Sequence, residues 1–412
     1  MNINAARLRN HIEAQSLIGK IGETGLCRPA HSADEKAVFR LAESWMHEAG
    51  MTTRIDHFGN LVGRLEGSDP TLPVLMMGSH LDTQPYGGRF DGVTGVLGAI
   101  EAVTTLSELG IKNKRAIEVI SFADEEGWRF NKGLFGSRGI LGKLEEGELQ
   151  RADKDGITRE QALKDFGCDI NRFKESEYKP GSIHCYLELH IEQGPVLDNS
   201  NQPLGVVSGI SGPLWWTVTL KGMAGHTGSV PMRMRKDPML GAAEIIVALN
   251  EIVTKDPTAP TVGSVASIQV FPNSRNIIPE EVVFTLDLRD IELERRNNYE
   301  KQIRDCIKSV ADKRQLTWQI QEDTNNEPRY CAPWLKDIIY KKTAALGLDT
   351  PELMSGPFHD ALALSYACDY AMIFVRSKDG ISHNPKEFSS WEDLALGTEV
   401  LYGTMLEIIE ND

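Results

Sequence analysis

The alternation of short apolar runs with amphipathic helical segments is the feature that most constrains the fold. One apolar run ends at Met77, two others occupy 116–122 and 185–189, and residues 33–49 and 93–109 carry apolar side chains at helical spacing. The same alternation resumes near the C-terminus. It predicts a mainly parallel sheet covered by helices, which places the chain in the α/β class.

The pattern changes between about residues 212 and 327. Segments follow one another there in the order β-α-β-β-α-β, which is the ferredoxin-like unit. A chain of 412 residues also exceeds what one core usually holds. We therefore predict that a domain of residues 212–327 is inserted into an α/β domain of residues 1–211 and 328–412. The expected elements of the insert are strands at 214–222, 262–271, 280–290 and 316–321 and helices at 238–255 and 293–314.

Composition and charge exclude several classes of protein. No run approaches the ~18 apolar residues of a membrane span, and the polar N-terminal stretch lacks the apolar core of a secretory signal. The net charge of -15 argues against nucleic acid or an anionic membrane as partner. The six scattered cysteines include no C-x-x-C pair, which disfavours a disulfide framework and a thiolate zinc site. We expect a cytoplasmic protein with reduced thiols.

Histidine and carboxylate side chains recur where predicted strands of the α/β domain end. In open α/β sheets this edge binds ligands, because loops converge there. Each stretch alone has a simpler explanation, since a histidine can be a hydrogen-bonded structural residue, and an acidic turn or Asp91 can cap a helix. Four such stretches at one edge favour a shared metal site. They are His80 with Asp82, Asp124 with Glu125 and Glu126, His190 with Glu192, and His383.

The ligand types indicate a hydrolytic metal centre. Imidazoles and carboxylates without thiolate suit zinc, manganese, cobalt or nickel. Three histidines and at least two carboxylates exceed what one tetrahedral ion needs, so two ions with a bridging carboxylate are more economical. Two cations ~3.5–4 Å apart can hold a hydroxide between them and polarise a carbonyl, which predicts hydrolysis.

Five stretches resemble the motifs of a known family, the dinuclear-metal aminoacylase and carboxypeptidase-G-like amidohydrolases. The likeness runs through nearly the whole chain and is specific for the family. Within the family, the motifs look like those of the branch of N-carbamoyl-L-amino acid hydrolases, allantoate amidohydrolases and β-ureidopropionases. It implies a metallopeptidase-like catalytic domain, and a homodimer that forms through the insert, which also acts as a lid. The stretches are "GSHLDTQPYGGRFDGVTGVL", "FADEEGWRF", "ELHIEQGPVL", "RNIIPEEVVFTLDLRD" and "FVRSKDGISHNPKEF".

The resemblance also implies a ligand set for two divalent metal ions. Asp91 would bridge the ions, Glu126 and His383 would complete one site, and His80 and His190 would complete the other.

Two further carboxylates receive roles from the resemblance. Asp82 would bind the second nitrogen of His80 and fix the orientation of that ring. Glu125 would be the general base, and its proton would pass to the leaving nitrogen.

The resemblance assigns Arg289 to the carboxylate of the substrate. A planar guanidinium binds a carboxylate well. Without the resemblance, the simpler reading is that Arg289 pairs with Asp287 or Asp290 on an exposed sheet face.

Four more residues match substrate-binding positions of the family. His226 and Asn276 match insert positions that bind substrate or stabilise the oxyanion, often across the dimer, and His226 is thereby also a catalytic candidate. Gln193 and His359 match pocket positions around the ureido group. Pro357-Phe358 departs from the small residues usual before this His-Asp pair, and the bulky ring is expected to reshape the pocket.

The leading function is hydrolysis of N-carbamoyl-L-amino acids to amino acid, ammonia and carbon dioxide. Allantoate or ureidoglycolate hydrolysis is the first alternative, and N-acyl-amino acid hydrolysis is the second. From another class, His80-x-Asp82 with His190 matches the two-histidine-one-carboxylate iron site of oxygenases, which predicts an all-β fold. A binding module without activity is the last alternative, although every metal and base position is filled.

Overall fold

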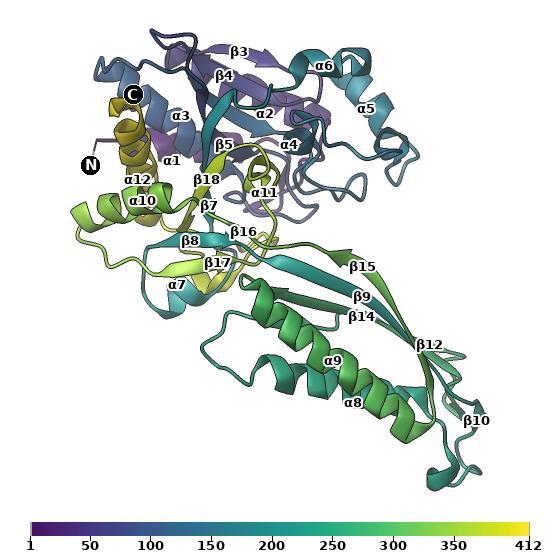
Figure 1. Cartoon of the computed structure of the whole chain (residues 1–412). Coiled ribbons are helices and arrows are strands. Elements are labelled where there is room, and N and C mark those ends of the chain that lie inside the picture. Colours follow the sequence, from purple (N-terminus) through teal and green to yellow (C-terminus); the bar gives the residue numbers. More distant parts are fainter. Residues whose placement is uncertain (1, 412) are drawn as a thin grey trace. The chain divides into compact units, whose positions relative to one another are not determined.

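The computed structural model describes residues 2–411, which form two compact units (Figure 1). We call Met1–Ser208 with Cys331–Asp412 the α/β unit, and Gly209–Tyr330 the inserted unit. Within residues 2–411, no helix is both long and apolar enough to cross a membrane.

A mixed sheet forms the centre of the α/β unit, in the strand order β16-β8-β18-β7-β5-β6-β4-β3, and β17 also pairs with β8. The central strands β18, β7, β5 and β6 are parallel to one another, whereas β8 and β4 add antiparallel strands on either side. The predicted parallel arrangement is confirmed for the centre of the sheet. The strands are β3 (Thr52–Ile55), β4 (Leu61–Leu65), β5 (Val74–His80), β6 (Ile117–Phe122), β7 (Ile183–Ile191), β8 (Leu204–Ile210), β16 (Arg329–Tyr330), β17 (Glu352–Ser355) and β18 (Asp369–Val375).

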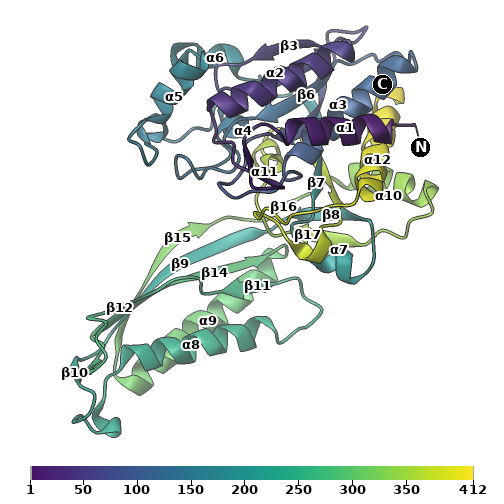
Figure 2. The ribbon, with the colours of Figure 1, turned by 180° about the vertical axis from the view of Figure 1, so that it is seen from behind.

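Helices lie on both sides of this sheet (Figure 1). Every residue of β5 and β6 is buried, which is why these strands read as continuous apolar runs. α3 packs on β5 and β7 and is covered by α1, α2 and α12, which are seen from the other side in Figure 2. The helices are α1 (Ala5–Gln15), α2 (Ala33–Glu48), α3 (Val93–Glu108), α10 (Pro333–Ala345) and α12 (Trp391–Glu410), with α4 (Phe135–Gly139) near β6 and α11 (Asp360–Leu364) near β7 and β18.

Two central strands extend further than the sequence predicted. β5 continues to His80, because its pairing with β6 reaches the His80–Phe122 pair. β7 continues to Ile191, paired with Val375 of β18. His80 and His190 therefore belong to the strands instead of following them.

A long connection joins β6 to β7, and the sequence pattern predicted no elements within it. After α4 it contains η1 (Glu148–Gln150), α5 (Arg159–Phe166), η2 (Ile170–Arg172) and α6 (Phe173–Ser176). These helices are too short to carry a clear periodic pattern.

The inserted unit has the antiparallel strand order β11-β14-β9-β15, with β12 also paired to β14. In chain order this is the predicted β-α-β-β-α-β pattern, except that the strand expected at 262–271 is divided into β11 and β12. Alternate residues of β14 are buried and pack with the helices in one core. The elements are β9 (Gly212–Lys221), α8 (Pro238–Val253), β11 (Val262–Ser264), β12 (Ile268–Phe271), β14 (Glu281–Asp290), α9 (Leu293–Arg314) and β15 (Thr317–Asn325), with a separate ladder of β10 (Gly225–His226) and β13 (Ile277–Ile278).

Candidate active site

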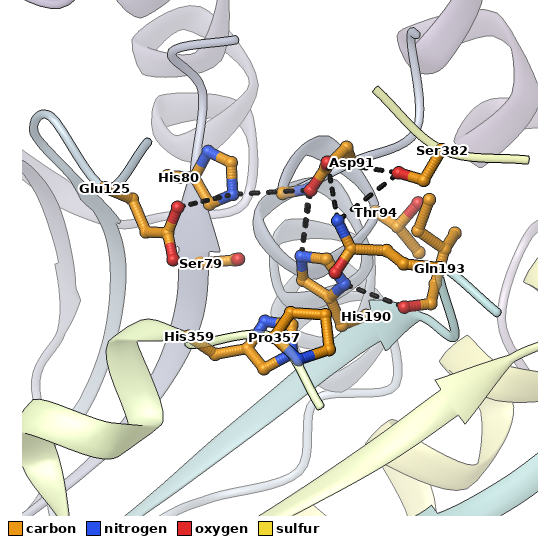
Figure 3. A network of polar contacts seen from close by, with 12 residues as sticks. Ser79, His80, Asp91, Thr94, Glu125, His190, Gln193, Pro357, His359 and Ser382 are labelled. Atoms are coloured by element: carbon orange, nitrogen blue, oxygen red, sulfur yellow. Dashed lines mark hydrogen bonds and ion pairs between the residues drawn. The ribbon is translucent and has the colours of Figure 1, made fainter. Parts of the chain in front are cut away.

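Three predicted ligands meet where β5, β7 and the loop before α3 come together (Figure 3). Asp91 Oδ1 lies 3.1 Å from His190 Nε2 and 3.6 Å from His80 Nε2. All three residues are buried, and one ligand atom from each lies within 4.8 Å of the others. This geometry could hold a metal ion. We call these residues the strand group.

The other oxygen of Asp91 faces a second set of ligands. Asp91 Oδ2 lies 3.1 Å from His383 Nε2, and that nitrogen is 3.7 Å from Glu126 Oε2. Asp91, Glu126 and His383 also have ligand atoms within 4.8 Å of one another. We call these residues the loop group. Asp91 therefore stands between two sets of donors, each able to hold a cation.

The loop before α3 places Asp91 without using it as a helix cap. The N-cap of α3 is Gly92, and no side chain caps the helix there. Gly92 has φ +65°, and a Cβ atom at this position would lie 2.5 Å from His80 Nε2. A larger residue would therefore collide with the His80 ring. The helix-cap explanation of Asp91 is wrong.

Asp82 contacts both His80 and the turn that carries Glu125 and Glu126. His80 Nδ1 lies 3.0 Å from the backbone carbonyl oxygen of Asp82 and 3.6 Å from its carboxylate. The carboxylate instead accepts hydrogen bonds of 3.3 Å from the backbone amides of Glu125 and Glu126. The carbonyl thus contacts His80 more closely, and the carboxylate supports the turn that carries the two glutamates.

Burial and charge shift the titration of the acidic groups. Burial raises the pKa of Glu125 well above its usual range. Burial, reinforced by the charge of Asp91, raises the pKa of Glu126 to about 7. The hydrogen bond to Asp91 raises the pKa of His383 to about 9. Buried carboxylates that repel one another, beside imidazole nitrogens, fit a divalent cation in both charge and donor type.

Gln193 and His359 lie beside the ligands. Gln193 Nε2 donates a 2.9 Å hydrogen bond to Asp91 Oδ2 and lies 3.3 Å from His383 Nε2. The buried His359 ring packs edge-on against His190, with 4.3 Å between ring centroids, and its Nε2 lies 2.8 Å from Ser355 Oγ. Both side chains therefore line the ligand cluster, as Figure 3 shows.

Comparisons with known proteins agree with this geometry. The family model described as Peptidase family M20/M25/M40 matches residues 76–407. The chain belongs to this family. An N-carbamoyl-L-amino-acid amidohydrolase of Pseudomonas sp. (strain NS671) is 47% identical to this M20 chain, over 99% of each chain. An allantoate deiminase of Arabidopsis thaliana is 38% identical, over 88% of this chain and 74% of its own length.

Solved structures show the same fold. The crystal structure of an amidase of the hydantoinase/carbamoylase family from Burkholderia multivorans superposes with a TM-score of 0.91 at 32% identity, covering 99% of this M20 chain and 98% of its own. The parallel centre of the sheet contradicts the all-β fold that the iron-oxygenase alternative requires. Membership of the M20 family confirms the resemblance on which the ligand set was predicted.

Three predicted substrate residues of the M20 chain belong to the inserted unit. His226 lies in β10, where its Nδ1 accepts a 3.0 Å hydrogen bond from the Gly228 amide. The Asn276 carbonyl accepts a 3.1 Å hydrogen bond from the Thr227 amide, which brings Asn276 to the same ladder. Their positions relative to the ligand cluster stay a prediction.

Arg289 is also in the inserted unit and pairs with Asp287. Its Nε and Nη2 atoms donate hydrogen bonds of 3.0 and 2.8 Å to the two oxygens of that carboxylate. Its guanidinium carbon lies 5.6 Å from the centroid of the Trp215 ring. The simpler reading of Arg289 is therefore present in the structure, and its role toward a substrate stays a prediction.

Three residues that support the predicted metal ligands, Gln84, Ser382 and Glu387, were not predicted from the sequence. Gln84 donates to Glu126 from its backbone amide (3.1 Å) and from its side-chain Nε2 (2.7 Å). Glu387 accepts hydrogen bonds from the Asp91 amide (3.1 Å) and from Ser382 Oγ (2.9 Å). All three occur inside the quoted motifs. Neither the type of these residues nor their spacing in the sequence indicated these contacts.

Proposed function

We propose that this chain hydrolyses the ureido C–N bond of N-carbamoyl-L-amino acids, releasing the L-amino acid, ammonia and carbon dioxide. The position of Asp91 is the observation that supports hydrolysis. One of its oxygens faces the imidazoles of His80 and His190, and the other faces the second set of donors, His383 with Glu126. The substrate class is supported by the 47% identical relative, which is named as an N-carbamoyl-L-amino-acid amidohydrolase.

We assign two divalent cations to the site, from zinc, manganese, cobalt and nickel. His80 and His190 would hold one, Glu126 and His383 would hold the other, and Asp91 would contact both. Bound there, such cations polarise a carbonyl oxygen and lower the pKa of water. The donor types and their spacing support this assignment.

Glu125 is assigned as the general base. Its carboxylate lies 3.7 Å from His80 Nε2 and is not a member of either ligand group. It would take a proton from the attacking water and deliver it to the leaving nitrogen. Burial raises the pKa of Glu125 well above its usual range.

The remaining assignments concern substrate recognition. Arg289 would bind the α-carboxylate, with Asp287 fixing the plane of its guanidinium. His226 and Asn276 would contact the substrate and stabilise the oxyanion of the tetrahedral intermediate. Gln193 and His359 would line the pocket around the ureido group, because both side chains lie against the ligand cluster.

We also propose that the inserted unit is a lid and forms a homodimer. Its β11-β12 edge carries exposed apolar side chains, with Val262 51%, Ile268 45% and Phe271 61% exposed. An open sheet edge with apolar side chains favours pairing with a second copy. We place the enzyme in the cytoplasm, where the six cysteines, all free in the structure, would stay reduced.

Allantoate hydrolysis is the second candidate, because the 38% identical relative is named as an allantoate deiminase. Allantoate also presents ureido groups and a carboxylate. N-acyl-amino acid hydrolysis is the third candidate.

One experiment ranks these candidates. The purified enzyme, loaded with zinc or manganese, is assayed with N-carbamoyl-L-methionine, allantoate, N-carbamoyl-β-alanine and N-acetyl-L-methionine for released amine or ammonia. The highest kcat/KM is expected for N-carbamoyl-L-methionine. A higher value for allantoate or the acetyl compound would replace the proposed substrate with that one.

A further inference from the structure

The turn that carries the two glutamates has an unusual backbone. We call residues 123–126 the glutamate turn. Asp124 has φ +53°, a left-handed conformation that non-glycine residues adopt rarely. Its side chain is buried, and Oδ1 has no hydrogen-bond partner among the residues that the structure describes. Such a conformation persists only where surrounding contacts enforce it.

Arg159 supplies the contact to the other oxygen of Asp124. Its Nη2 donates a 2.6 Å hydrogen bond to Asp124 Oδ2, and the arginine side chain is 0% exposed. The guanidinium lies 5.0 Å from the Phe130 ring and 4.4 Å from the Phe135 ring, measured to the ring centroids. A buried arginine packed against two aromatic rings has little freedom to move, so it fixes the carboxylate of Asp124 in place.

Two further hydrogen bonds of Arg159 join this contact to the surrounding loops. Nη1 donates a 3.0 Å hydrogen bond to Glu148 Oε2, and Nη2 donates a 2.8 Å hydrogen bond to the carbonyl of Lys132. Arg138 binds the same Glu148 carboxylate from another side, at 2.8 Å through Nη2. One guanidinium thus joins the glutamate turn to two neighbouring segments.

Backbone hydrogen bonds complete the support of the glutamate turn. The amides of Leu134, Phe135 and Gly136 donate to the carbonyls of Glu125, Asp124 and Ala123, at 3.0, 3.2 and 2.8 Å in that order. In addition, the carboxylate of Asp82 accepts hydrogen bonds from the amides of Glu125 and Glu126. Both the carbonyls and the amides of the turn are therefore held.

We propose that Arg159, acting through Asp124, is a positioning residue that sets the orientation of Glu125 for proton transfer. The inference rests on the proposed function, in which Glu125 is the general base. It also gives a role to the long connection between β6 and β7, because α5 delivers Arg159 to the turn. A lysine cannot replace this residue, since one ammonium group cannot contact Asp124, Glu148 and the Lys132 carbonyl in the same planar arrangement.

Three variants of the full-length, metal-loaded enzyme test the inference. Arg159→Met combined with Asp124→Asn removes both charges of the buried pair and leaves Glu148 paired with Arg138. Arg159→Lys keeps the charge but changes the geometry. Arg138→Met is the matched control, because the side-chain hydrogen bonds of Arg138 within the described residues go to the same Glu148 and to the Gly133 and Lys143 carbonyls, and none goes to Asp124. Each is compared with wild type in kcat, KM, metal content and thermal midpoint.

For the double variant we expect kcat on N-carbamoyl-L-methionine to fall about 10- to 100-fold with KM unchanged, the loss that a displaced catalytic group produces. Arg159→Lys should also lower kcat, whereas Arg138→Met should keep it. Wild-type kcat in the folded double variant or in Arg159→Lys would overturn the inference. If the double variant does not fold, Arg159→Lys decides the question. A wild-type enzyme with no activity on any ureido substrate would instead overturn the proposed function.

Discussion

The two ligand groups that share Asp91 are built on different supports. In the strand group, His80 and His190 lie in β5 and β7, and each side chain is 1% exposed. In the loop group, His383 is outside any strand or helix, has φ +51°, and exposes 47% of its side chain. The sheet core therefore fixes one group, whereas hydrogen bonds from separate loops fix the other. We expect the two groups to differ in rigidity and in metal affinity.

The largest effect is expected from Asp91→Ala, because this carboxylate belongs to both groups. Its removal should cost both cations and all turnover. Metal content of the dialysed protein, measured by mass spectrometry, checks this outcome. Asp69→Ala serves as control, since the Asp69 carboxylate accepts hydrogen bonds from the amide and hydroxyl of Thr71 and the substitution keeps the backbone of the turn. One cation retained at full occupancy in Asp91→Ala would show that the groups do not share this ligand.

Glu125→Gln should separate chemistry from metal binding. The amide keeps the shape of the carboxylate but cannot accept the proton, so kcat should fall about 10²- to 10⁴-fold. Metal content should equal that of wild type, because Glu125 belongs to neither ligand group. Measurable loss of either cation would make Glu125 a ligand, and wild-type kcat would remove it as the base.

Alanine at His190 and at His383 tests the comparison directly. Each change should cost one cation. In the metal-free protein, His190→Ala should also lower the free energy of unfolding by about 2–4 kcal/mol, because it leaves a cavity beside His359. His383→Ala should lower it by less, because that side chain is half exposed and water screens its pair with Asp91. Urea denaturation of the two metal-free variants gives both values. Equal losses would refute the difference in support.

The same difference explains which parts of the site could be predicted from the sequence. Strong apolar runs revealed β5 and β7, and the rule that ligands gather at strand ends then singled out His80 and His190. The supports of the loop group could not be found in this way. Glu387 binds the Asp91 amide across 296 positions of the chain, and no local pattern records such a contact. In the sequence, Gln84 is recognisable only as a polar loop residue. Its role becomes evident in the structure, where its side chain donates a hydrogen bond to Glu126.

The secondary structure divides in the same way into elements that the sequence predicted and elements that it did not. The long helices α8 and α9 were predicted with nearly correct bounds, because their apolar residues repeat over several turns. The short strands β3 and β4 and the short helices α5 and α6 were not predicted, since packing decides them more than local periodicity does. Most of the residues that support the glutamate turn lie in the connection between β6 and β7, where no elements were predicted. This is why Arg159 had no role in the sequence analysis.

The smallest effect is expected from Asp82→Asn. This substitution tests whether the Asp82 carboxylate holds the glutamate turn or orients His80. The structure places this carboxylate on the amides of Glu125 and Glu126, so the substitution should weaken the cation of the loop group, by about 10- to 100-fold in affinity. The cation of the strand group should be nearly unaffected, because the Asp82 carbonyl that contacts His80 is kept. Titration calorimetry with manganese measures the two affinities.

Adding Asp82→Asn to His383→Ala makes this distinction sharper. His383→Ala alone should retain only the cation of the strand group. Any further loss of affinity for that cation in the double variant must therefore act through His80. Unchanged affinity in the double variant supports the role of Asp82 in holding the glutamate turn. A 10-fold loss would restore the carboxylate as the partner that orients His80, the role that the family resemblance implied.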